Sequence, residues 1–357
     1  MKNPSLLSLE LSKRKQRLLK NLHKNQAILL SQPADITYFT GFNQFLVTNE
    51  RETLAYLSHQ RITVLHPHFT TVANIAQIEY RLGSQGSYFK NHLTELMEQD
   101  QVAELLVDQD SLFAGEFLAL KKIERFKIAA LDKKIIWQQR LLKSESELKK
   151  IRKAKQITQK TLNRVLKNLQ VGISEEKVAL ILETEFKKFP HTGSAFPAIV
   201  AFGRHTTSPH HQPTNKKLRQ EMPILIDCGA KYQGYCGDMT RTIWFGQQPT
   251  RKFLKIEKLI KKAYKAAKSE LNKLKSGQIV SAAQLDQAAR QVITAAGFGP
   301  QFTHTTGHGL GLEIHEPPSI GSHNQLPVAS GMVITIEPGI YLKNKFGYRH
   351  ENTIIVE

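Results

Sequence analysis

Cysteine is nearly absent from this sequence: Cys228 and Cys236 are the only two among 357 residues. Two cysteines are too few for a disulfide framework, which excludes the class of small disulfide-stabilised secreted proteins and indicates a reducing compartment. The pair could form half of a zinc site, but no second pair accompanies it. The scarcity of cysteine therefore predicts a cytoplasmic protein.

Long apolar runs are missing as well. The stretch AFPAIVAF (195–202) is about half of the roughly 18 residues that a membrane-spanning helix needs. The N-terminal MKNPSLLSLELSKRKQRLL lacks the continuous apolar core and the small-residue cleavage site of a secretory signal. We therefore expect no membrane partner, and we interpret the N-terminus as an amphipathic helix.

Acidic residues are few beside basic ones, with 31 Asp and Glu against 50 Lys and Arg, for a formal charge of +19. A basic surface that binds nucleic acid is one interpretation. The other is lysine on solvated helix faces, because the excess is spread over KRKQRLLK, KKIRKAKQ and KLIKKAYKAAK without a nucleic-acid motif. We expect no specific nucleic-acid partner, and a basic binding module stays as the non-enzymatic alternative.

The pattern of apolar residues divides the chain into two parts. Helical and strand-like runs alternate in residues 1–143, which predicts an α/β domain. SESE (144–147) has the form of a capping box and begins a helix that we expect to stop at Gly172. Further helices are expected over 174–189 and over 251–275, before Gly277. Because apolar strand-like runs lie between them, residues 144–357 are predicted to be α+β, with an antiparallel sheet covered by helices.

Four acidic residues adjoin apolar, β-prone runs in the second part. Asp227 follows PILI, Asp238 lies beyond a glycine-rich turn, Glu337 follows MVITI, and Glu351 precedes NTIIV. A buried carboxylate needs a partner, and neighbouring carboxylates repel one another unless a proton or a cation lies between them. Two divalent ions bridged by carboxylates would balance the charge of all four.

The stretch HTTGHGLGLEIHE (304–316) combines three histidines with three glycines. It lacks the Lys-Ser/Thr of a phosphate-binding loop. His304 and His308 have the spacing of a zinc-binding helix, but Gly307 and Gly309 disfavour a helix. A glycine on each side lets the backbone at His308 approach a metal ion closely, so we select this imidazole as a ligand.

Five stretches together resemble a known family: SAFPAIVAFGRHTTSPHH (194–211), IDCGAKYQGYCGDMTRT (226–242), TGHGLGLEIHEPP (306–318), ITIEPGIY (334–341) and YRHEN (348–352). They are similar to the M24 metallopeptidases of the pita-bread fold, in the branch of Xaa-Pro aminopeptidases and Xaa-Pro dipeptidases (prolidases). ADITYFTGF (34–42) resembles the creatinase-type N-terminal domain of the same proteins. The resemblance covers most of residues 144–357 and implies a catalytic pita-bread domain there.

The resemblance also implies roles for individual residues. The ligands of a two-metal site would be Asp227, Asp238, His308, Glu337 and Glu351. Manganese is the expected metal, with cobalt, zinc and iron as alternatives; such ions lower the pKa of water and supply hydroxide near neutral pH. Glu337 would be the general base, and His210 and His315 would bind the scissile peptide. His304 and Arg349 would line the substrate pocket, with Arg349 and Thr240 also orienting carboxylates.

The expected substrates are small peptides with proline at the second position. Dipeptidases of this branch often carry Arg just after the His-Glu-x-Pro motif, where this chain has Ser319. That difference favours an Xaa-Pro aminopeptidase, with a prolidase as the alternative. His211 beside His210 leaves open which imidazole enters the pocket, although the family's Pro-His pattern favours His210. A homodimer is implied by the resemblance alone.

Overall fold

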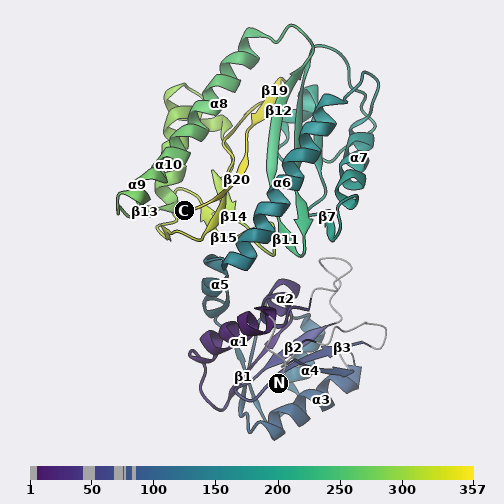
Figure 1. Cartoon of the computed structure of the whole chain (residues 1–357), viewed down its shortest axis with the longest axis vertical. Helices are drawn as coiled ribbons and strands as arrows, with labels where there is room; N and C mark the ends of the chain where they lie inside the picture. Colours follow the sequence, from purple (N-terminus) through teal and green to yellow (C-terminus); the bar gives the residue numbers. More distant parts are fainter. Residues whose placement is uncertain (1–5, 43–52, 68–74, 76–77, 83–85) are drawn as a thin grey trace. The chain divides into compact units, whose positions relative to one another are not determined.

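The computed structural model describes residues 6–42, 53–67, 75, 78–82 and 86–357. The chain forms two compact units, Met1–Gln139 and Arg140–Glu357, drawn in purple to blue and in teal to yellow in Figure 1. The sequence places a domain boundary between residues 143 and 144. That the two sides of this boundary fold independently stays a prediction. No helix in the described part of the chain is both long and apolar enough to cross a membrane.

The first unit is built on a six-stranded mixed sheet, confirming its α/β class. The strand order is β4-β3-β2-β1-β5-β6, with β1–β2 and β2–β3 antiparallel and the other pairs parallel. The apolar side chains of the central strands are buried. The strands are β1 (Gln26–Leu30), β2 (Leu54–Leu57), β3 (Ile62–His66), β4 (Glu79–Leu82), β5 (Glu104–Val107) and β6 (Lys127–Ala130). The helices are α1 (Leu6–Leu19), α2 (Pro33–Thr40), α3 (Gly86–Gln99), α4 (Ala114–Lys121) and, at its end, α5 (Lys134–Leu141).

Helices of the second unit begin close to where the sequence predicts them. Ser144 caps α6 (Glu145–Lys167): its Oγ accepts from the Glu147 backbone N–H at 3.4 Å, and Oε2 of Glu147 accepts from the Ser144 N–H at 3.0 Å. That helix ends at Lys167, before the expected stop at Gly172. The expected helix over 251–275 is divided at Leu271 into α8 (Arg251–Glu270) and α9 (Asn272–Lys275). The remaining helices are α7 (Glu175–Lys187), α10 (Ala282–Ala295) and the short 3-10 helices η1 (Gly203–Thr207) and η2 (Gly299–Gln301).

Antiparallel strands form the sheets of the second unit, as the sequence predicts. One sheet has the order β12-β9-β8 and another the order β15-β14-β17-β20. Their strands are β8 (Ile199–Phe202), β9 (Met222–Cys228), β12 (Met239–Phe245), β14 (Gly307–Gly309), β15 (Glu316–Ile320), β17 (Val333–Ile336) and β20 (Asn352–Ile355). Shorter pairings involve β7 (Thr192–Ser194), β10 (Ala230–Tyr232), β11 (Tyr235–Cys236), β13 (Val280–Ser281), β16 (Pro327–Val328), β18 (Gly339–Leu342) and β19 (Phe346–Arg349).

Two apolar clusters hold the helices against these strands. Ile157 of α6 and Val178 of α7 are buried in one cluster with Ile226 of β9. The other cluster joins α8, α10 and β19 through residues that include Phe253, Ile293 and Tyr348. In Figure 1, α8 and α10 lie on one side of the strands, and α6 and α7 lie toward the other. The helices therefore cover the sheets. Polar residues lie next to the first residues of β12 and β20.

Candidate metal centre

The four acids that the sequence singles out lie at neighbouring strand ends. Thr240 pairs with Asp227 between β12 and β9, so Asp238 lies just beyond this pairing, before β12 begins. Ile336 pairs with Asn352 between β17 and β20, which places Glu337 and Glu351 together at the same end of that sheet. The registers therefore place two pairs of carboxylates, from three sequence stretches, at strand ends that Thr240 connects by its hydrogen bond to Glu351.

His308 joins the carboxylates from the middle of β14. Its Nε2 lies 3.3 Å from Oε1 of Glu337 and 3.6 Å from Oδ2 of Asp238. Potential ligand atoms of Asp238, His308 and Glu351 all lie within 4.8 Å of one another. The strand conformation also bears out the expectation that Gly307 and Gly309 prevent a helix at this histidine.

Burial and mutual repulsion change how these carboxyl groups titrate. Burial, then the negative charge of Glu351, raises the pKa of Asp238 well above its ordinary value. The pKa of Glu351 is likewise raised well above normal by burial and by Glu337. Burial is also the main cause that raises the pKa of Glu337 to about 7, although Arg349 opposes the shift. The chain thus gathers more negative charge here than its own cations balance.

Unpaired oxygen atoms show that the residues present fit a cation. Oδ1 of Asp227 and Oδ1 of Asp238 are buried and have no hydrogen-bond partner within the described residues. Such buried acceptors cost free energy unless something satisfies them. Carboxylate oxygens with one imidazole are a donor set that suits manganese and related divalent ions. Both cysteines are buried free thiols, and neither belongs to a potential metal cluster among the residues described.

Arg349 connects the carboxylates to a nearby hydroxyl network. Its Nη2 donates to Oδ2 of Asp227 at 2.7 Å, and its Nε donates to Oγ1 of Thr240 at 3.1 Å. Thr240 in turn donates to Oε2 of Glu351 at 2.6 Å. Arg349 and Thr240 therefore hold Asp227 and Glu351 in fixed orientations.

The three expected pocket histidines occupy different surroundings. His304 Nε2 lies 2.9 Å from the hydroxyl of Tyr341, and burial, then Arg349, lowers the pKa of His304 to about 4. The ring of His315 packs edge-on against that of His308, with 4.4 Å between centroids. His315 and His210 are both exposed, and the charge of His210 acts on both His304 and His315. His210 therefore interacts electrostatically with both other imidazoles, and His315 also interacts with Glu337 and Asp227 of the cluster.

Two contacts were not foreseen from the sequence. The hydroxyl of Tyr341 accepts from Nη1 of Arg349 at 2.8 Å, and burial raises the pKa of Tyr341 to about 12. Oγ1 of Thr335 accepts from the backbone N–H of His308 and donates to Oε1 of Glu337 at 3.2 Å. Thr335 lies two residues before Glu337, so strand alternation could have indicated their common face. No pattern in the sequence indicated that Tyr341 contacts Arg349 and His304.

Glycine is required beside His308 for a steric reason. A Cβ at Gly307 would lie 2.1 Å from the backbone oxygen of Thr335, in the neighbouring strand β17. A Cβ at Gly309 would lie 2.2 Å from the backbone oxygen of Pro317. The glycines thus let three backbone segments approach closely around the imidazole.

Comparison with known proteins adds independent findings. The family model of metallopeptidase family M24 matches residues 149–357. An uncharacterized peptidase of Staphylococcus saprophyticus is 40% identical over 217 residues, which are 61% of this chain and 60% of that protein. The chain thus spans about three-fifths of the length of such curated relatives.

Solved structures extend the similarity over nearly the whole chain. An Xaa-Pro dipeptidase from Bacillus anthracis superposes with a TM-score of 0.87 at 27% identity, covering 97% of this chain and 95% of the other. An X-Pro aminopeptidase from Thermotoga maritima has a TM-score of 0.82 at 28% identity, with coverage of 96% and 95%. The expected fold, a pita-bread domain preceded by a smaller α/β domain, is confirmed.

Proposed function

The chain belongs to metallopeptidase family M24, and from this premise we propose that it hydrolyses the peptide bond between an N-terminal residue and a following proline. The observation that carries the proposal is the cluster of four carboxylates and His308, in which two buried carboxylate oxygens have no partner among the described residues. Proline lacks an amide N–H and has a fixed φ, so this bond needs a shaped site. The names of the two similar solved structures support the same substrate class.

The proposed cofactor is a pair of divalent ions, preferably Mn²⁺, held by Asp227, Asp238, His308, Glu337 and Glu351. When bound, such ions supply a hydroxide nucleophile near neutral pH and polarise the carbonyl that is attacked. The raised pKa values of Asp238 and Glu351 support this assignment, because they arise first from burial and then from neighbouring carboxylates, and bound cations would stabilise the buried negative charge. Co²⁺, Zn²⁺ and Fe²⁺ would fit the same donors.

The chain's own residues have distinct proposed tasks. The carboxylate of Glu337 exchanges a proton with the attacking water and the leaving amine. His210 and His315 donate to the scissile peptide and to the developing oxyanion. Arg349 holds Asp227 in place and, through its contact with Tyr341, fixes His304 at the pocket wall.

The geometry around Ser319 favours an aminopeptidase over a dipeptidase. Ser319 is exposed on β15 and pairs with His308 of β14 in the sheet register. A dipeptide presents a free carboxylate close to the scissile bond, which a cation at this position would bind, and serine provides none. The dipeptidase remains the second candidate because a solved Xaa-Pro dipeptidase is similar over 97% of this chain.

Peptide hydrolysis tests the proposal directly. Metal-depleted full-length protein is supplied with Mn²⁺ and assayed on Ala-Pro and Ala-Pro-Ala, with Asp238→Ala as the inactive control. We expect release of alanine from the tripeptide, loss of activity with a chelator and recovery with Mn²⁺. A chain that cleaves neither peptide with any of the four metals contradicts the proposal, and tight, salt-sensitive RNA binding that survives Asp238→Ala supports the basic binding module instead.

Three further proposals concern the whole protein. These are a homodimer, a cytoplasmic location and a boundary between a creatinase-like domain of residues 1–143 and a catalytic domain of residues 144–357. Family resemblance supports the first, the scarcity of cysteine the second, and the capping box at residues 144–147 the third. Light scattering of the purified protein tests the dimer, which a monomeric mass at micromolar concentration contradicts. Residues 144–357 are expressed alone to test the boundary. Cooperative unfolding of this fragment supports the boundary, and its absence contradicts it.

A further inference from the structure

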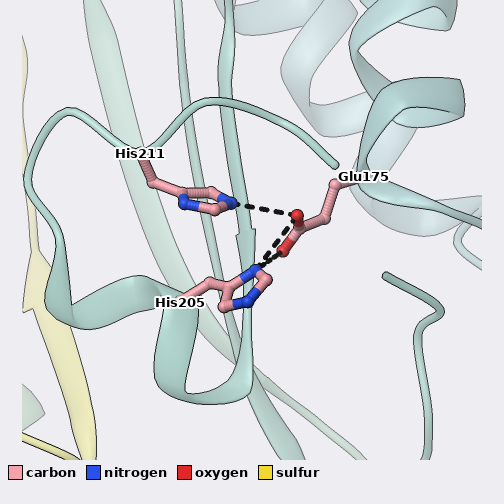
Figure 2. A group of neighbouring side chains, drawn as sticks. All are labelled: Glu175, His205 and His211. Carbon is pink, nitrogen blue, oxygen red and sulfur yellow. Dashed lines mark hydrogen bonds and ion pairs between the residues drawn. The ribbon is translucent and has the colours of Figure 1, made fainter. Parts of the chain in front are cut away.

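A second cluster of potential metal ligands lies in the same unit, formed by residues without a task in the proposed hydrolysis. Glu175 is the first residue of α7, His205 belongs to η1, and His211 follows four residues after that helix. Figure 2 shows both imidazole rings turned toward the carboxylate of Glu175. Nε2 of His211 lies 2.9 Å from Oε2, and Nδ1 of His205 lies 2.9 Å from Oε1 and 3.2 Å from Oε2.

The donor atoms have the arrangement of a three-ligand metal site. One nitrogen from each ring and one oxygen of Glu175 all lie within 4.8 Å of one another. The oxygen–nitrogen separations of 2.9 and 3.2 Å are hydrogen-bond distances. Tetrahedral ligands about 2.0–2.2 Å from one ion lie about 3.3–3.6 Å apart, so a movement of a few tenths of an ångström would admit an ion. The side chain of Glu175 is fully buried, whereas those of His211 and His205 are 13% and 31% exposed. The imidazole side is thus open to solvent, where a further ligand can bind.

We propose that Glu175, His205 and His211 form a separate binding site for one transition-metal ion, of which Zn²⁺ is the representative. Two imidazoles and one carboxylate leave a fourth position for water, as in His₂Glu zinc sites. Each imidazole coordinates through the nitrogen that now donates to Glu175, after the proton on that nitrogen has moved, by exchange with solvent, to the other ring nitrogen. The ion replaces the two histidine hydrogen bonds to the carboxylate, with no net gain or loss of protons.

The carboxylate is held ready for this task by other donors. The backbone N–H of Phe202 donates to Oε1 at 2.8 Å, and the N–H and hydroxyl of Thr214 donate to Oε2 at 3.0 and 2.7 Å. Burial alone would raise the pKa of Glu175, but hydrogen bonds from His211, Thr214 and Phe202 outweigh it and place the pKa below its ordinary value. The carboxylate is therefore ionised and fixed in orientation, in the way that hydrogen-bond donors behind known metal ligands orient them.

Charge around the cluster favours a transition metal over a hard ion. Lys216 donates from Nζ to the backbone oxygen of Phe202 at 2.7 Å, and its positive charge also interacts with Glu175. One partly compensated carboxylate attracts Ca²⁺ or Mg²⁺ weakly, because these ions need several oxygen ligands. Imidazole nitrogens suit Zn²⁺, Cu²⁺ and Ni²⁺ instead. The two clusters of this unit thus differ in the metal ion that they favour. The carboxylate-rich centre contains one imidazole, that of His308, whereas this cluster contains two.

Binding at this site would act on the segment that carries His210. The segment from Gly203 to Thr214 is attached to Glu175 at both ends through His205 and Thr214. It is attached elsewhere by Thr206, which accepts from the Gly347 N–H, and by Pro209, whose oxygen accepts from Arg349. A bound ion would add strong bonds to His205 and His211 and so restrict this segment without touching the scissile peptide.

Zinc counting tests the proposal without reading activity. Metal-free full-length protein is incubated with Zn²⁺ and passed through a desalting column, and bound zinc is measured by elemental analysis. We expect the double variant His205→Asn, His211→Asn to retain one zinc per chain fewer than the wild type, while the exposed-histidine control His323→Asn retains as much as the wild type. Equal zinc in the double variant and the wild type overturns the proposal.

A second measurement keeps the proposal testable if the double variant does not fold. Asp238→Asn, Glu351→Gln weakens the carboxylate centre and leaves Glu175, His205 and His211 intact. X-ray absorption of zinc bound to this variant should show two imidazole ligands per ion. No retained zinc, or zinc with fewer than two imidazoles, overturns the proposal. Because neither experiment measures hydrolysis, failure of the proposed peptidase activity leaves both results interpretable.

Discussion

Nη2 of Arg349 donates to Oδ2 of Asp227 at 2.7 Å, across a sequence separation of 122 residues. The same guanidinium donates to Thr240 and to the hydroxyl of Tyr341. A planar fork with several fixed donors can make these contacts at once, whereas an ammonium group acts as a single point charge. The arginine therefore sets the orientation of a proposed metal ligand together with one wall of the pocket.

Replacing Arg349 by lysine should weaken both metal binding and catalysis. We expect Arg349→Lys to lower Mn²⁺ affinity and kcat by about 10- to 100-fold, the usual cost of losing a residue that orients a metal ligand. Metal titration followed by steady-state kinetics at saturating Mn²⁺ separates the two effects. Arg219→Lys, at an exposed position, is the matched control and should behave as the wild type. Unchanged metal affinity in Arg349→Lys would show that Asp227 does not need this contact.

Removal of metal should make stability depend on pH in the neutral range. The folded pKa of Glu337 is about 7, above its ordinary 4.5, mainly because of burial. A raised folded pKa means that stability is fully present below about pH 4.5 and is lost as pH rises through 7. For Glu337 the loss is on the order of 3 kcal/mol. Urea unfolding in a chelator at pH 5 and pH 8 measures it.

Mn²⁺ should reverse this pH dependence. Metal binds the ionised carboxylates, so its stabilising effect should be larger at pH 8 than at pH 5. Glu337→Gln removes one of the titrating groups and should make the metal-free profile less steep between about pH 4.5 and 7. An equal change in stability between pH 5 and pH 8 in metal-free wild type and Glu337→Gln would contradict the assignment of this titration to Glu337.

A buried ion-pair cluster beside His315 should contribute to stability in a different pH range. Nη2 of Arg140 lies 2.5 Å from Oε1 of Glu316, and Nζ of Lys143 lies 3.2 Å from Oε2. Burial opposes ionisation of Glu316, but Arg140 and Lys143 outweigh it and lower its pKa to about 2. Because this folded pKa is depressed, the contribution is present above about pH 4.5 and is lost as pH falls toward 2.

Substitution of Glu316 tests the same cluster at neutral pH. Glu316→Gln removes a buried carboxylate that pairs with Arg140 and Lys143 and should lower the free energy of unfolding by about 3–5 kcal/mol. Glu313 also pairs with Arg140 but is 33% exposed, so Glu313→Gln should cost about 1 kcal/mol or less. Urea unfolding at pH 7 compares the two variants. Equal losses would mean that burial does not distinguish the two ion pairs.

The close approach of strands at Gly307 should make this position intolerant of any side chain. A Cβ would lie 2.1 Å from the oxygen of Thr335, so β14 and β17 must separate in Gly307→Ala. We expect a loss of about 3 kcal/mol in unfolding free energy, together with weaker Mn²⁺ binding because His308 moves. Gly193→Ala is the control, since a Cβ at Gly193 would meet no atom within 4 Å, and it should change stability by less than about 0.5 kcal/mol.

Local sequence determined much of the chain's secondary structure. Ser144 and Glu147 form the capping box that their spacing predicts, and glycines on both sides of His308 exclude a helix, because capping and helix propensity act over a few residues. Helix ends were less predictable: α6 ends at Lys167 instead of continuing toward Gly172, and the expected helix over 251–275 divides at Leu271. Packing against other elements decides such ends.

Polar residues beside apolar strands also pointed to the carboxylate centre, because burial of an unpaired carboxylate is costly wherever it occurs. Their roles as ligands stay a prediction. Only the tertiary structure decided that Tyr341 lies between Arg349 and His304, and that Glu175 meets two histidines 30 and 36 residues away. The sequence carries the chemical groups and their local conformations. Which groups meet across a long separation depends on strand register and helix packing, and these are properties of the whole folded unit.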